Sequence, residues 1–174
     1  MESAIQLQAW RDLYVMLGSS SAALIGLLFV ATSLRLNEIA NDPVYRVRAH
    51  RNSAYLIITL TEAILILTPQ PTVILGAGIT AINLFGLGLA FSNAYRFLYK
   101  TRDDSKRGGM TLYRSITFNT GFMLGIAGGV CLIKQSNWGM YLVTASYATF
   151  LVSVTLNAWS IMLGVGRGVQ GGES

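Results

Sequence analysis

The sequence is poor in charge, cysteine and histidine. Only 12% of its 174 residues are charged, about half the share usual in soluble proteins, which is too little to cover a water-facing surface. A single cysteine excludes an intrachain disulfide framework. One cysteine and one histidine together are too few ligands for a conventional zinc or haem site. Hydrophobic residues make up 52%, and thirteen Lys and Arg against eight Asp and Glu give a net charge of +5. This composition is typical of a polytopic membrane protein.

Long uncharged runs recur along the chain, and a transmembrane helix needs roughly 20 apolar residues. One run contains Pro69 and Pro71, so its Thr-Pro-Gln-Pro-Thr segment predicts a tight turn between two spans. The runs are apolar all round, which disfavours the amphipathic helices of a soluble bundle. We therefore expect an all-α integral membrane bundle, a single transmembrane domain over 1–174 with a flexible tail at 168–174 and five spans at about 13–34, 52–68, 72–95, 115–133 and 138–163.

Basic residues are distributed unevenly between the two sides of such a bundle. Eleven of the thirteen fall in the linkers 35–51 and 96–114 and in the C-terminal tail, which would share one side. The other side carries only Arg11 and Lys134. The positive-inside rule then places the N-terminus outside and the C-terminus in the cytoplasm, as in a bacterial cytoplasmic (inner) membrane.

The first linker also contains a helix-start signal. Asp42 is a good N-cap, and Pro43 suits the first helical position, so the second helix is predicted to begin near Pro43, before the membrane. Basic side chains beside a membrane attract anionic headgroups by about 1 kcal/mol each, and no nucleic-acid-binding motif accompanies them. We expect anionic lipids and no nucleic acid as partners, with lipid contacts from Arg46, Arg48, Arg51, Lys106 and Arg107.

Small residues spaced four apart form stripes on three of the predicted spans. Such stripes allow close backbone contact between membrane helices, as in glycine zippers. They do not reveal whether the partner helix belongs to the same chain. Three stripes are more than the internal packing of five helices obviously requires. We therefore expect a homo-oligomer or docking to a larger membrane complex. The stripe residues are Gly18, Ala22, Gly26, Gly86, Ala90, Gly121, Gly125 and Gly129.

Glu62 is the one ionisable residue well inside a predicted span, about 10 Å from the outer turn. A charge there costs on the order of 2.5–3.5 kcal/mol, so the carboxyl must be protonated, hydrogen-bonded or facing water. Thr59 and Tyr55 share roughly its face. One interpretation is a proton or cation site at a pore or groove. The other is a neutral acid bonded inside the bundle, with possible partners Ser19, Ser20, Ser21, Thr144, Tyr147 and the deeper Asn83.

The sequence contains no GxSxG, P-loop or HExxH motif. Asp103 and Asp104 lie among Lys and Arg, which is typical of a solvated, charge-balanced turn. His50 would lie on the opposite membrane side from the Ser19–Ser21 run, so a catalytic triad is not expected. We therefore expect no enzyme, no catalytic residue, no metal site and no cofactor.

The stretch Trp10–Ile39 resembles the opening of an uncharacterised family of small bacterial polytopic membrane proteins. Some members carry a label as modulators of a membrane protease, and the family supplies no catalytic residues. A fainter similarity links 10–31 to the pore helix of Orai calcium channels, whose acidic residues this span lacks. The family resemblance covers mainly 10–70 and rests on Trp10, Tyr14, Gly18, Ala22, Ala23, Gly26, Leu27, Leu28, Phe29, Val30, Ala31, Ser33, Leu34, Leu67 and Pro69.

Two functions are compatible with these features. The first is a non-enzymatic assembly, accessory or regulatory subunit that packs through small-residue helix faces against itself or a larger membrane complex. The alternative is a homo-oligomeric ion or proton channel that uses Glu62. The two differ in whether the stripe of Tyr55, Thr59 and Glu62 faces water.

Overall fold

A computed structural model describes the backbone of residues 2–34, 43–100 and 108–165, and the side chains of a smaller part of these ranges. Within them the chain is all-helical and contains no strand. The predicted tail at 168–174 lies outside the described residues. The helices are α1 (Glu2–Leu34), α3 (Pro43–Leu67), α4 (Thr72–Lys100), α5 (Gly108–Ile133) and α6 (Trp138–Val165).

Local sequence signals account for the helix ends. α3 begins at Pro43, as the Asp-Pro signal predicted, and it ends at Leu67 before the predicted proline turn. In that turn the Gln70 side-chain amide donates to the Leu65 carbonyl at 2.7 Å, which satisfies one of the orphan acceptors at the helix end. α5 ends differently, with Gln135 at a positive φ of 54°.

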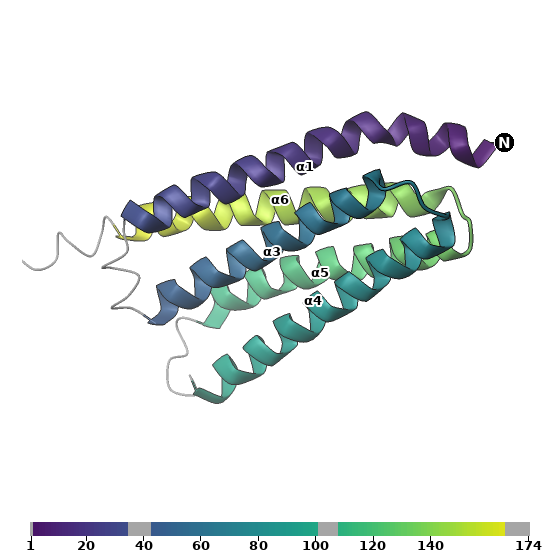
Figure 1. Cartoon of the computed structure of the whole chain (residues 1–174). Helices are drawn as coiled ribbons and strands as arrows, with labels where there is room; N and C mark the ends of the chain where they lie inside the picture. Colours follow the sequence, from purple (N-terminus) through teal and green to yellow (C-terminus); the bar gives the residue numbers. More distant parts are fainter. Residues whose placement is uncertain (1, 35–42, 101–107, 166–174) are drawn as a thin grey trace, which may run out of the picture.

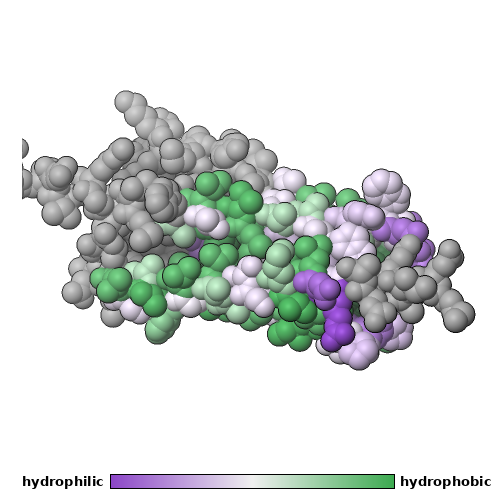
Figure 2. All heavy atoms as spheres, turned by 90° about the horizontal axis from the view of Figure 1, so that it is seen from above, coloured by the Kyte–Doolittle hydropathy of each residue, from purple (hydrophilic) through white to green (hydrophobic). Residues whose placement is uncertain are grey.

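Three of the helices are long and apolar enough to cross a membrane, judged on the described residues alone. These segments are Trp10–Leu34, Thr72–Phe91 and Trp138–Leu156, and Asn119–Ile133 is a shorter apolar stretch. In Figure 2 hydrophobic side chains predominate along the middle of the visible face, while hydrophilic ones gather toward the end where α1 begins. These features are compatible with a membrane protein.

Four helices form a closed ring, in which α3, α4, α5 and α6 each pack against the next and α6 returns to α3. α1 lies outside the ring, mainly against α3 and with a smaller contact to α6 (Figure 1). Consecutive helices run in opposite directions, so the turns at 68–71 and 134–137 lie at the same end (Figure 1). One side of α1 therefore has no neighbouring helix within the described chain.

The buried core falls into two hydrophobic clusters. The one nearer the described turns surrounds Tyr14 and Tyr147, whose rings meet edge-on at 6.0 Å. The other contains Tyr55, Phe122 and Phe150, which join α3, α5 and α6 through ring contacts of 4.8–6.0 Å. A small group of polar side chains is buried among these apolar residues and forms the site described next.

Candidate functional site

Glu62 lies inside the ring and is 1% exposed. Its Oε1 accepts a hydrogen bond from Nδ2 of Asn83, on α4, at 2.6 Å. Asn83 is fully buried, and the same Nδ2 also donates to the Ile79 carbonyl one turn earlier, at 2.9 Å. The bond joins α3 to α4 across the interior. This arrangement matches the interpretation of Glu62 as an acid hydrogen-bonded inside the bundle.

Two acceptor atoms of the Glu62–Asn83 pair have no hydrogen-bond donor in the described part of the chain. Glu62 Oε2 and Asn83 Oδ1 are both buried, and neither has a hydrogen-bond partner among the described residues. Buried polar atoms are almost always paired, so two orphans on adjoining groups require an explanation. Asn83 cannot supply it, because both of its amide hydrogens are already directed at acceptors.

Gly125 of α5 makes room for the Asn83 amide. A Cβ at this position would overlap the amide's oxygen, carbon and nitrogen. The glycine that the sequence marks as a packing residue therefore also determines where the polar pair can lie. Its small size lets α5 close over Asn83, which is fully buried.

A second polar connection runs beside Glu62 and links α1, α3 and α6. The Thr59 hydroxyl donates to the Leu56 carbonyl at 2.9 Å and lies 3.3 Å from the Ser21 hydroxyl. The Thr59 carbonyl accepts from the Tyr147 hydroxyl. The side chains of Thr59, Ser21 and Tyr147 are each fully buried, so Thr59 connects three helices.

Tyr55, the third member of the predicted polar stripe, is buried on α3, and its ring belongs to the aromatic cluster with Phe122 and Phe150. Another tyrosine lies nearer the acid. Tyr14 of α1 shares its hydrophobic cluster with Ala63, the residue after Glu62, and its hydroxyl is hydrogen-bonded to Thr144 at 2.9 Å. The site is therefore built from α1, α3, α4 and α6.

Of the possible partners of Glu62 that the sequence offers, the carboxyl is bonded to Asn83, which the sequence placed deeper in the span. Glu62 is seven residues before Pro69 and Asn83 is twelve after Pro71. A depth counted in residues from the turn therefore places Asn83 deeper than Glu62. Helical side chains lean toward the N-terminus of their own helix. Glu62 therefore leans away from the turn and Asn83 leans toward it, which reduces the offset. This lean is the signal that could have paired them.

Most of the predicted packing stripes are filled from within the chain. A Cβ at Gly129 would lie 2.8 Å from the Gly76 carbonyl, and one at Gly76 would lie 2.6 Å from the Gly129 carbonyl, so the α4 and α5 backbones touch. Gly18 packs against Ala63 in the same way, with 3.0 Å to its Cβ. The other stripe glycines of α4 and α5 meet side chains, Gly86 at Phe122, Gly121 at Phe150 and Gly125 at Asn83, and Ala90 packs on the second cluster.

The stripe on α1 differs beyond Gly18. Ala22 is exposed, and a Cβ at Gly26 would meet nothing within 4 Å in the described structure. Residues at helical spacing on both sides are also exposed, so a continuous outer face runs along α1. We call this the α1 outer face, and it consists of Val15, Ser19, Ala22, Gly26, Phe29 and Ser33.

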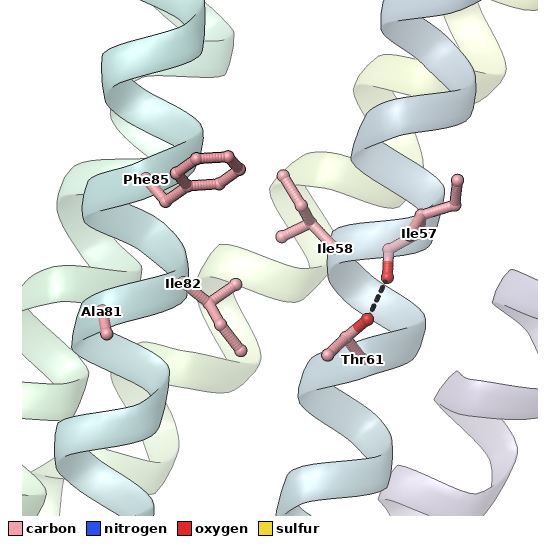
Figure 3. A pocket seen from close by; sticks show the side chains of 6 residues that line it. All are labelled: Ile57, Ile58, Thr61, Ala81, Ile82 and Phe85. Carbon is pink, nitrogen blue, oxygen red and sulfur yellow. Dashed lines mark hydrogen bonds between the residues drawn. The ribbon is translucent and has the colours of Figure 1, made fainter.

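An apolar groove of about 380 Å³ separates α3 and α4 on the outside of the ring (Figure 3). The one hydroxyl in it, on Thr61, donates back to the Ile57 carbonyl at 2.8 Å (Figure 3). The groove therefore offers only carbon surface. Its lining comes from Ile57, Ile58 and Thr61 of α3 and Ala81, Ile82 and Phe85 of α4.

The predicted lipid-contacting residues lie largely outside the described side chains. Lys106 and Arg107 fall in an undescribed segment, and Arg46 and Arg48 lie on the first turns of α3, where only the backbone is described. Arg51 is partly exposed. Among the described residues no three His, Cys, Asp or Glu side chains are grouped as a metal site would require.

Comparison of the chain with protein-family models, with curated proteins and with solved structures found no match.

Proposed function

We propose that the chain is a non-enzymatic assembly or accessory subunit of a membrane, and that it associates with a second copy of itself through the α1 outer face. In this proposal all five helices span a bacterial inner membrane, with the N-terminus outside. The alternating helix directions support it, since the helix ends that flank the Arg-rich linkers, at Leu34, Pro43, Lys100 and Gly108, lie at one end of the bundle (Figure 1).

The observation that carries the proposal is that the stripe glycines differ in whether another helix packs on them. The stripe glycines of α4 and α5 are filled by neighbouring helices, whereas Gly26 on α1 is open. In lipid a small residue on an outer face gains nothing by itself, because helix association depends on close backbone contact. The Ser33 hydroxyl of this face is satisfied locally, since it donates to the Phe29 carbonyl at 2.8 Å. The face is therefore suited to contact with another helix.

A second copy fits this face for two reasons. Small residues spaced four apart pair with an identical stripe, since each backbone approaches the other at the same positions. The face also carries no charge between Val15 and Ser33, so two copies meet without repulsion. Copies inserted with the same topology would cross in parallel at Ala22 and Gly26.

Cysteine cross-linking in the native membrane tests the proposal. In a Cys131→Ala background, Gly26→Cys should form a disulfide-linked dimer on oxidation, because a disulfide requires Cα atoms within about 7 Å. Gly88→Cys is the matched control, since Gly88 on α4 is equally open, and it should stay monomeric. Equal cross-linking of the two variants would indicate random collision and contradict the proposal.

An oligomeric ion or proton channel is the second candidate, favoured by the orphaned Oε2 of Glu62. An ionisable side chain at membrane depth commonly marks an ion or proton pathway. In proteoliposomes this candidate predicts a flux that Glu62→Gln changes in size or pH dependence. The subunit proposal predicts no flux for either protein.

A further inference from the structure

The Glu62–Asn83 pair has two acceptor atoms without a hydrogen-bond donor among the described residues, and a single added hydrogen could satisfy both. Asn83 Nδ2 donates to Glu62 Oε1 and to the Ile79 carbonyl, so no donor is left on the amide. Glu62 Oε2 and Asn83 Oδ1 are both unpaired among the described atoms. If the carboxyl is ionised, both atoms are acceptors and neither can satisfy the other.

One proton on the carboxyl resolves this shortage. We propose that Glu62 is a proton-binding site, whose protonated carboxyl donates from Oε2 to Asn83 Oδ1 while Oε1 accepts from Asn83 Nδ2. The two groups are already 2.6 Å apart at one end. Small rotations about the terminal side-chain torsions, which are soft in Glu and Asn, bring the other end together. The result is a cyclic acid–amide pair with every polar atom satisfied.

Among the side chains that the structure describes, none beside Glu62 supplies a positive charge that would favour an ionised carboxylate. The titratable groups that face it from neighbouring helices are Tyr14 of α1 and Tyr147 of α6. Both tyrosine hydroxyls are hydrogen-bonded, to Thr144 and to the Thr59 carbonyl. The described side chains of α4 and α5 include no charged residue.

The proton would also hold α3 against α4. These two helices touch less extensively than α4 and α5, and the apolar groove separates them on the outer side (Figure 3). Glu62 and Asn83 join them on the inner side. Loss of the proton would leave a buried charge beside an unpaired carbonyl oxygen, and the contact between α3 and α4 would weaken.

Infrared spectroscopy of the purified protein in detergent reads the protonation state directly. At neutral pH we expect the carbonyl band of a protonated, hydrogen-bonded carboxylic acid, which disappears in Glu62→Gln. In Asn83→Leu the band should shift toward that of a less strongly bonded acid. A carboxylate band that Glu62→Gln removes would overturn the proposal. So would an acid band that Asn83→Leu leaves unmoved.

The pH dependence of unfolding provides a second readout. A folded state that holds one more proton than the unfolded state loses stability as pH rises, by up to about tenfold in the unfolding equilibrium per pH unit. Glu62→Gln should abolish this dependence and remain folded at neutral pH, because the Gln amide donates to Asn83 Oδ1 in place of the proton. Identical pH profiles would contradict the proposal. If sodium stabilised the wild type more than choline did, and had no such effect on Glu62→Gln, the site would bind a cation. That result would also contradict the proposal.

This inference does not depend on association through α1. The infrared band and the pH profile are properties of the bundle interior and can be read on a monomer. Failure of the cross-linking experiment would therefore leave the Glu62 result intact, and the reverse also holds.

Discussion

Gly125 lies where any side chain would collide with Asn83. We predict that Gly125→Ala destabilises the protein by about 1–3 kcal/mol, the usual cost of overpacking, because the Asn83 amide must move away from Glu62. Gly88→Ala on α4 is the control, because Gly88 lies outside the proposed interface. Its added methyl meets only open space, so it should be neutral or stabilising by up to about 1 kcal/mol. Thermal unfolding in one detergent measures both, and equal effects would contradict the role of Gly125.

At this scale the sequence identifies residues better than it identifies their partners. Glu62 and Thr59 are recognisable because polar groups are rare in an apolar span, and the structure buries both. Asn83 was only one of several possible partners, because choosing it depends on the lean of two side chains and the offset of two helices. The bond between Tyr14 and Thr144 joins residues 130 apart in the chain, and no local pattern encodes such a pairing.

The end of α5 is closed by a Schellman motif without the usual glycine. Gln135 adopts a positive φ of 54°, its amide donates to the Leu132 carbonyl, and the Ser136 amide donates to the Cys131 carbonyl. A side chain in this conformation costs roughly 1–2 kcal/mol, which glycine avoids. We predict that Gln135→Gly stabilises the protein by roughly 0.5–1 kcal/mol, since glycine loses part of the gain to chain entropy.

Chemical unfolding of the purified protein tests this prediction. Ser136→Gly, the matched control, replaces the neighbouring residue, which has no positive φ, and should be neutral or destabilising. Destabilisation by Gln135→Gly would show that the Gln135 side chain contributes more than its backbone strain costs.

The hydrogen bond of Tyr14 to Thr144 is one of the contacts that join α1 to α6, beside the ring contacts of Trp10 with Tyr141 and of Tyr14 with Tyr147. We predict a coupling of about 0.6–1.5 kcal/mol between Tyr14→Phe and Thr144→Val in a double-mutant cycle of unfolding free energies. A coupling of zero would mean that the bond contributes nothing to the α1 contact.

Helix positions are the most predictable feature of this chain. Pro43 marks the start of α3, and the prolines after Leu67 mark its end, because proline acts locally. Which helix a glycine stripe packs against is not determined by the neighbouring sequence. Gly129 packs on Gly76, while a Cβ at Gly26 would meet nothing within 4 Å, although both glycines belong to similar small-residue patterns. Which stripe is filled internally depends on how the whole ring closes.

Over its described residues the molecule consists of a ring of four helices with α1 attached outside it. The stripe glycines of the ring contact neighbouring helices, whereas Ala22 and Gly26 of α1 lie on the outside. That division is the physical basis for regarding the chain as a subunit that assembles through α1. It also separates the two proposals, because the Glu62 site lies within the ring and the α1 outer face lies beyond it.

The most direct test of this account is the mass of the particle extracted from native membranes in mild detergent. Wild type and Gly88→Leu should give the same homo-oligomer, and Gly26→Leu should give the monomer, because both glycines are open but only Gly26 lies in the proposed interface. An unchanged mass for Gly26→Leu would contradict the account. A wild-type particle that contains a different protein at fixed stoichiometry would show that the α1 partner is not a second copy.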